Sequence, residues 1–131
     1  MDKHIDGPQD PAELYASRLV TVQGRRVLLD SDAAGLYEVP LGELRRRVRA
    51  EAARFPEDFM LCLSAEEGGG LALRRGGPAP RFAFTVEGIA MLAAVLGSPL
   101  AVQGNINMTR AFVMLDRLAR AGAGTFAPCM N

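Results

Sequence analysis

The chain has 131 residues, 49% of them hydrophobic, which is typical of one ordinary domain and too short for two. Lysine plus arginine and aspartate plus glutamate both number 15, so the formal net charge is zero and no global field attracts nucleic acid or anionic lipid. Any affinity for DNA must therefore come from basic residues that cluster locally.

The compartment is indicated by the cysteines and the apolar runs. Cys62 and Cys129 are too few for a disulfide framework, and Cys62 sits in an apolar run where we expect it to be a buried small hydrophobe. The longest apolar run, Ile89 to Leu96, is far shorter than the ~20 residues that span a bilayer. We therefore expect a cytoplasmic protein without a membrane partner.

The first elements in chain order are a leader and a hairpin. Residues 1–12 combine glycine and proline with charges, which predicts a disordered leader. Two apolar runs, Leu14 to Val22 and Val27 to Leu29, flank a polar link that contains Gly24. This pattern predicts a β-hairpin.

A pair of helices is predicted next, and it is the central feature of the sequence. A short helix, Ala33 to Tyr37, follows Asp30 and Ser31, either of which could cap it, and a turn leads to a longer helix from Leu41 to Arg54. The longer helix has its apolar stripe at Leu41, Leu44, Val48 and Ala52. Its five arginines outnumber its two glutamates. Two helices joined by a tight turn, with the second one basic, can place that second helix in the DNA major groove, although a charge run is more often a solvated face.

The middle of the chain is predicted to contain a strand and a flexible loop. Phe55-Pro56 is expected to stop the preceding helix, and Phe59 to Leu63 to form a largely buried strand. Ser64 with Glu67 makes a capping-box pattern. Three consecutive glycines then predict that any helix stops at once. We expect residues 68–80 to form a flexible loop whose Arg74 and Arg75 contact phosphate, or else a plain irregular connector.

The last part of the chain is predicted to hold a strand and two helices. Phe82 and Phe84 should share one face of a short strand from Arg81 to Thr85. Thr85 caps a helix from Val86 to Leu96 that Gly97 ends. Ser98 and Pro99 start the longest helix, which should end near Ala121 and leave residues 122–131 as a tail. Its wide apolar stripe extends beyond any obvious partner, so it could mediate self-association; the stripe comprises Met108, Ala111, Leu115 and Leu118.

These elements predict the α+β class. We expect one small domain over residues 13–121, with short antiparallel strands or hairpins packed on four to five helices that include the helix-turn-helix-like pair.

Several sequence blocks resemble a known family. They read L-L-D-S-D-x-A-x-L-Y-x-V, R-F-P-E-D-F-M, F-A-F-T-x-x-G-I-A-M-L and N-I-x-x-x-R-A-F-V, between about Val20 and Leu118. In this order they are similar to the ORF-six N-terminal domain, a relative of the KilA-N and Bro-N domains of phages and large DNA viruses. The resemblance implies a DNA-binding domain of phage antirepressors and other viral or prophage regulators.

Family members commonly have glycine where this chain has Glu38, and asparagine near Arg45 and Glu51. The resemblance therefore implies that any direct base contact at position 45 is made by an arginine, which can read guanine.

No catalytic, metal or cofactor site is predicted. His4 is the only histidine and lies in the leader, so neither a nucleophilic triad nor a zinc site can be assembled. The acidic pairs Glu57-Asp58 and Glu66-Glu67 are expected to cap and solubilise rather than bind metal. We therefore do not expect an enzyme.

Two hypotheses for function follow. The first is a regulatory module that binds double-stranded DNA, with Arg45, Arg46, Arg47 and Arg49 on phosphates or base edges and Arg25, Arg26, Arg74 and Arg75 as outer phosphate contacts. The second is a protein-interaction module that binds a repressor, or a second copy of itself, through the C-terminal helix without contacting DNA.

Overall fold

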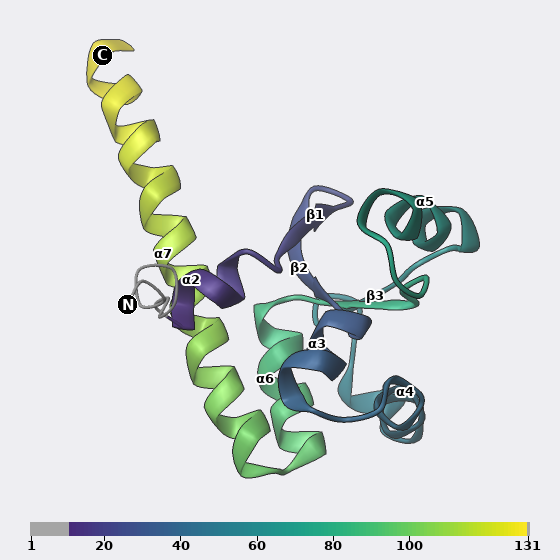
Figure 1. The fold of residues 1–131 in the computed structure, drawn as a ribbon. Coiled ribbons are helices and arrows are strands. Elements are labelled where there is room, and N and C mark those ends of the chain that lie inside the picture. Colours follow the sequence, from purple (N-terminus) through teal and green to yellow (C-terminus); the bar gives the residue numbers. More distant parts are fainter. Residues whose placement is uncertain (1–10, 131) are drawn as a thin grey trace, which may run out of the picture.

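The computed structural model describes residues 11–130, and the side chains of residues 13–121. Figure 1 shows a small sheet with helices on both sides and one long helix along an edge of the molecule. In chain order the elements are α2 (Pro11–Ala16), β1 (Val20–Val22), β2 (Arg25–Leu29), α3 (Asp30–Tyr37), α4 (Leu41–Ala50), the 3-10 turn η1 (Ala52–Arg54), β3 (Met60–Cys62), α5 (Ala65–Arg75), β4 (Phe82–Phe84), α6 (Val86–Leu96) and α7 (Pro99–Met130).

The four strands form an antiparallel sheet in the order β1-β2-β4-β3. The β1–β2 hairpin turns at Gln23 and Gly24, which both have positive φ (54° and 76°). Positive φ at both central residues is the geometry that matches the twist of a two-residue hairpin. The predicted hairpin and the α+β class are confirmed.

The strands separate two hydrophobic layers because successive side chains point to opposite faces. On one face Val27 and Leu29 of β2 pack with Leu71 of α5. On the other face Leu28 and Phe84 pack into the larger core formed by the remaining helices. The sheet is therefore covered by α5 on one face and by α3, α4, α6 and α7 on the other.

The long helix α7 packs along α2 and α6, and its first half is part of the core. Ala101, Met108 and Ala111 are fully buried there, and Gly104 lies directly against the ring of Tyr37. In Figure 1 the second half of α7 extends past α2, away from the other elements.

Helix ends that depend on local signals agree with prediction. The Thr85 hydroxyl accepts a hydrogen bond from Gly88 N at 3.3 Å, and Gly97 ends α6 in the left-handed region. The Ser98 hydroxyl likewise accepts from Ala101 N at 3.1 Å at the start of α7. Ser64 and Glu67 form the reciprocal capping box of α5.

The predicted loop over residues 68–80 is wrong, because Gly68, Gly69 and Gly70 lie inside α5 and only residues 76–81 form a connection. The capping box starts the helix, and Leu71 holds it on the sheet. The glycine at 68 has a packing reason, since a Cβ there would meet Pro80 O at 2.5 Å. Consecutive glycines in a sequence predict the end of a helix, because glycine has a low helix propensity. Here the packing of α5 on the sheet keeps these residues helical.

The predicted helix pair needs three corrections. The first helix begins at Asp30 rather than Ala33, and neither Asp30 nor Ser31 caps it, because the N-cap is Leu29 and has no side-chain bond. The second helix ends at Ala50 rather than Arg54, and η1 follows. Ala52 is therefore exposed and is not part of the apolar stripe.

Other corrections concern the ends of the chain and the edge of the sheet. Leu14 belongs to α2 rather than to a strand, and α7 continues beyond Ala121 to Met130. Cys62 is exposed rather than buried, because β3 is an edge strand. The first ten residues of the predicted leader lie outside the described residues, and α2 begins at Pro11.

Candidate nucleic-acid interface

The helix pair is joined by a turn whose geometry is set by Glu38. This residue adopts the left-handed region (φ 56°, ψ 46°) after Tyr37, and its N–H is directed to the carbonyls at the end of α3. Pro40 then serves as the N-cap of α4, and Leu44 and Val48 bury the inner side of α4 in the core.

Arg45 does not point to solvent. Its Nε donates to Asp30 Oδ2 at 2.8 Å, and its Nη2 donates to the carbonyl of Ala79 at 2.9 Å. The Asp30 side chain is fully buried and that of Arg45 is only 16% exposed. The same carboxylate oxygen accepts the N–H groups of Arg81 and Phe82 at 3.2 Å. Arg45 therefore fastens α4 to α3 and to the start of β4, a role that charge patterning did not predict.

Arg47 is also used inside the protein. Its Nη2 donates to the carbonyl of Val95 at 2.8 Å, in the last turn of α6. A guanidinium at this place satisfies a carbonyl that has no partner within its own helix and complements the helix dipole. Arg45 and Arg47 thus hold α4 from two sides.

Arg46 and Arg49 lie on the solvent face of α4, together with the small residues Gly42 and Ala50. The Arg46 side chain is 67% exposed and makes two hydrogen bonds to Glu43, of 3.1 and 2.6 Å. The Arg49 guanidinium lies over the ring of Phe82, with 5.8 Å between its carbon and the ring centroid. A surface ion pair is worth only about 0–1 kcal/mol, so Arg46 can exchange Glu43 for another anion at little cost.

The Glu43–Arg46 pair shifts the ionisation of both groups. The hydrogen bond from Arg46, followed by its charge, lowers the pKa of the Glu43 carboxyl, and the same contact raises the pKa of Arg46. Both groups are therefore charged at neutral pH, and Glu43 offsets part of the positive charge of this face.

The four outer arginines divide into two groups. Arg25 donates to the carbonyls of Glu57 and Asp58 at 3.2 and 3.1 Å, and Arg75 pairs with Asp32 at 2.8 Å. Arg26 and Arg74 are exposed, and neither side chain makes a hydrogen bond or ion pair with the residues that the structure describes. Arg74 lies on α5, across the sheet from α4.

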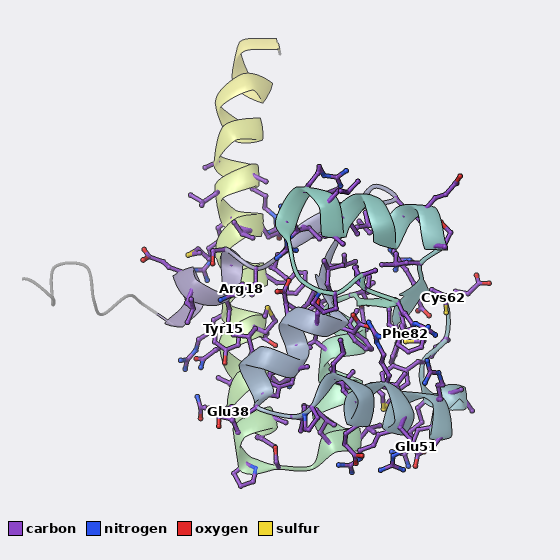
Figure 2. All side chains as sticks on the ribbon, turned by 45° about the vertical axis from the view of Figure 1, so that its right-hand side comes forward. Tyr15, Arg18, Glu38, Glu51, Cys62 and Phe82 are labelled. Carbon is purple, nitrogen blue, oxygen red and sulfur yellow. The ribbon has the colours of Figure 1, made fainter. Side chains whose placement is uncertain are left out.

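Arg81 and Phe82 were missed as site residues. Both line a hollow of about 470 Å³ beside Arg49, between α4 and α5. Figure 2 shows Phe82 close to Cys62, its partner in the sheet register. The sequence does contain a signal for them, because Arg81 directly precedes the strand of Phe82. This arginine could have been grouped with the arginines of α4 as part of one basic site.

Metal and membrane sites were also considered. Among the described residues no group of three or more His, Cys, Asp or Glu side chains could hold a metal ion. Within that part of the chain, no helix combines the length and apolar character needed to cross a membrane.

The comparison with known proteins gives one family. The model of the ORF6N domain matches residues 17–95, which is more than half of the chain and contains the α3–α4 pair, the sheet and nearly all of α6. No curated protein and no solved structure matches.

Proposed function

Because the chain belongs to the ORF6N domain family, we propose that it is a DNA-binding regulatory module of phage or prophage type, an antirepressor or transcriptional regulator. The contact with duplex DNA is made through the outward face of α4. Arg46 and Arg49 supply the charge, in a protein whose formal net charge is zero.

The observation that carries the proposal is that two of the four arginines of α4 bind other parts of the protein, whereas the other two face solvent. Arg45 and Arg47 are bound within the protein and fix the orientation of the helix. Arg46 and Arg49 remain on the outer face, where Gly42 and Ala50 add no bulk. A rigidly held helix with arginines beside small residues can approach a groove closely, and arginine suits phosphate and guanine alike.

The test is a fluorescence titration of a labelled random-sequence duplex at several salt concentrations. We expect Arg46→Gln and Arg49→Gln each to weaken binding and to reduce the slope of log K against log salt by about 0.9. Glu43→Gln should strengthen binding, because it removes the carboxylate that competes with phosphate for Arg46.

The matched controls come from a second surface ion pair. Arg120 and Asp116 on α7 are 2.6 Å apart, as close as Arg46 and Glu43, yet lie on a different element. Arg120→Gln and Asp116→Asn should leave binding unchanged. The proposal would be refuted if substitutions in the two ion pairs changed the duplex affinity equally. It would also be refuted if Arg46→Gln and Arg49→Gln left that affinity unchanged.

A second candidate function is favoured by the surface of α7. The apolar stripe that Met108 and Ala111 bury in the core continues to Leu118, which is 62% exposed, and Val113, which lines the same hollow as Leu118, is 42% exposed. Such a patch is typical of a protein-interaction surface, for a repressor or for a second copy of the chain. Sedimentation measures whether two copies of the chain associate. Leu118→Glu should convert an oligomer into a monomer, and a monomeric wild-type protein would contradict self-association.

A further inference from the structure

The hollow beside Arg49 has the size of a small-molecule site. We call it the Phe82 groove; it lies over the ends of β3 and β4, between α4 and α5, and its walls include Arg49, Cys62, Ser64, Pro80, Arg81 and Phe82. Its volume of about 470 Å³ falls within the range of ligand pockets, about 300–1,000 Å³.

The charge of the groove is positive and uncompensated. Arg49 and Arg81 are among its lining residues, and none of the lining residues that the structure describes is an aspartate or a glutamate. A second hollow, of about 300 Å³, shows the contrast: Arg18 and Arg75 line it, but Asp32 lies 3.5 and 2.8 Å from their guanidinium groups. The Phe82 groove therefore favours an anion supplied from outside, since guanidinium groups form strong charge-assisted hydrogen bonds with phosphate.

The floor of the groove is apolar and partly aromatic. Phe82 is half-buried and Pro80 is buried, so both are held in place by the fold. The Phe82 backbone is further fixed by its N–H bond to Asp30. An aromatic ring beside arginines is the combination on which nucleobases stack in single-stranded nucleic-acid sites.

We propose that the Phe82 groove binds one nucleotide, with its phosphate on Arg49 and Arg81 and its base against Phe82 and Pro80. The nucleotide is either free in solution or an unpaired unit of a DNA strand; both present the same phosphate and base. The site overlaps the duplex contact proposed for α4 at Arg49 but does not include Arg46.

Cys62 provides the readout, because its exposed thiol lines the groove. In a Cys129→Ser variant it is the only thiol of the chain. The rate of maleimide labelling is measured with 5′-dAMP, deoxyadenosine, inorganic phosphate, a short 5′-phosphorylated single strand and a blunt duplex. Protection by 5′-dAMP indicates a free nucleotide, and protection by the single strand alone indicates a unit of DNA.

We expect 5′-dAMP or the single strand to slow labelling at concentrations where deoxyadenosine and phosphate do not. Arg81→Gln should raise the concentration needed for protection roughly tenfold. Arg117→Gln, which changes an exposed arginine on α7, should have no effect. Arg46→Gln should also leave protection intact, so loss of duplex binding and loss of the groove can be told apart.

Three results would overturn the proposal: no protection by either nucleotide probe, equal protection by inorganic phosphate, or protection that is unchanged in Arg81→Gln. Circular dichroism of each variant shows that the fold persists. The side chain of Arg81 makes no hydrogen bond with the described residues, and its backbone N–H bond to Asp30 survives the substitution.

Discussion

Arg45 Nε lies 2.8 Å from Oδ2 of Asp30, a carboxylate that is completely shielded from solvent. The pair joins the starts of α3 and β4 to the middle of α4. A buried ion pair contributes little relative to a well-packed apolar pair, but loss of one partner leaves a buried charge uncompensated. We therefore expect Arg45 to stabilise the fold rather than to contact DNA.

Arg45→Met should lower the free energy of unfolding by about 3–5 kcal/mol, because the Asp30 carboxylate stays buried without its cation. Urea denaturation measures the loss. Adding Asp30→Asn removes the orphaned charge and should restore part of the stability, with a coupling energy that a double-mutant cycle reports. If Arg45→Met kept full stability but lost duplex binding, Arg45 would be a DNA contact instead.

The helix caps and the hairpin of this fold have local causes, whereas the roles of the arginines have tertiary ones. Thr85, Ser64 with Glu67, and Gly97 were correctly assigned because a cap and its partner lie within a few residues of each other. The hairpin was predictable for the same reason. These features depend on the order of residues and hardly on the rest of the fold.

The roles of the arginines could not be predicted, because their partners are distant in sequence. Arg45 reaches Asp30 and Ala79, which are 15 and 34 residues away, and Arg47 reaches Val95, 48 residues away. A helical pattern places Arg45, Arg46, Arg47 and Arg49 around one cylinder but does not show which sides the protein covers. The contacts in the folded protein are needed to distinguish Arg45 and Arg47, which bind other parts of the chain, from Arg46 and Arg49, which face solvent.

The three glycines of α5 can show whether tertiary packing or helix propensity determines the residue at each position. Nothing lies within 4 Å of a Cβ built on Gly69, and one on Gly70 meets only an Arg74 side-chain atom at 3.7 Å. Gly69→Ala and Gly70→Ala should therefore each stabilise the protein by up to about 1 kcal/mol. Gly68→Ala is the control and should destabilise it by about 1–3 kcal/mol, because the new methyl group overlaps Pro80 O. Stabilisation by all three substitutions in thermal unfolding would contradict this account of Gly68.

The left-handed conformation of Glu38 predicts a gain from glycine at the end of α3. The left-handed region costs an L-residue other than glycine about 1–2 kcal/mol, whereas glycine adopts it without this strain. Because Glu38 is exposed, Glu38→Gly should raise the free energy of unfolding by up to about 1 kcal/mol. Gly97→Ala is the matched reverse change at the end of α6, where φ is 67°, and should lower stability by a similar amount. A loss of stability in Glu38→Gly would mean that the glutamate side chain has a role of its own.

The capping box of α5 should make stability depend on pH. The hydrogen bond from the Ser64 backbone N–H, followed by that from the Gln23 side chain, lowers the pKa of the Glu67 carboxyl below its usual value of 4.5. A lowered folded-state pKa means that the stabilisation is fully present above about pH 4.5 and is lost as the pH falls through the lower folded-state value. Glu67→Gln keeps a side-chain acceptor but cannot titrate. Its stability deficit relative to wild type should therefore be present at pH 7 and disappear in strong acid.

Urea denaturation at a series of pH values measures this difference between wild type and Glu67→Gln. Glu66→Gln serves as the control, because the side chain of this neighbouring glutamate is exposed and makes no hydrogen bond with the described residues. The loss of stability at pH 7 should be smaller for Glu66→Gln than for Glu67→Gln, because only Glu67 accepts the Ser64 N–H. A deficit of Glu67→Gln that stayed constant down to strong acid would show that the charge of the carboxylate does not stabilise the start of α5. The cap would then act through its hydrogen-bond geometry alone.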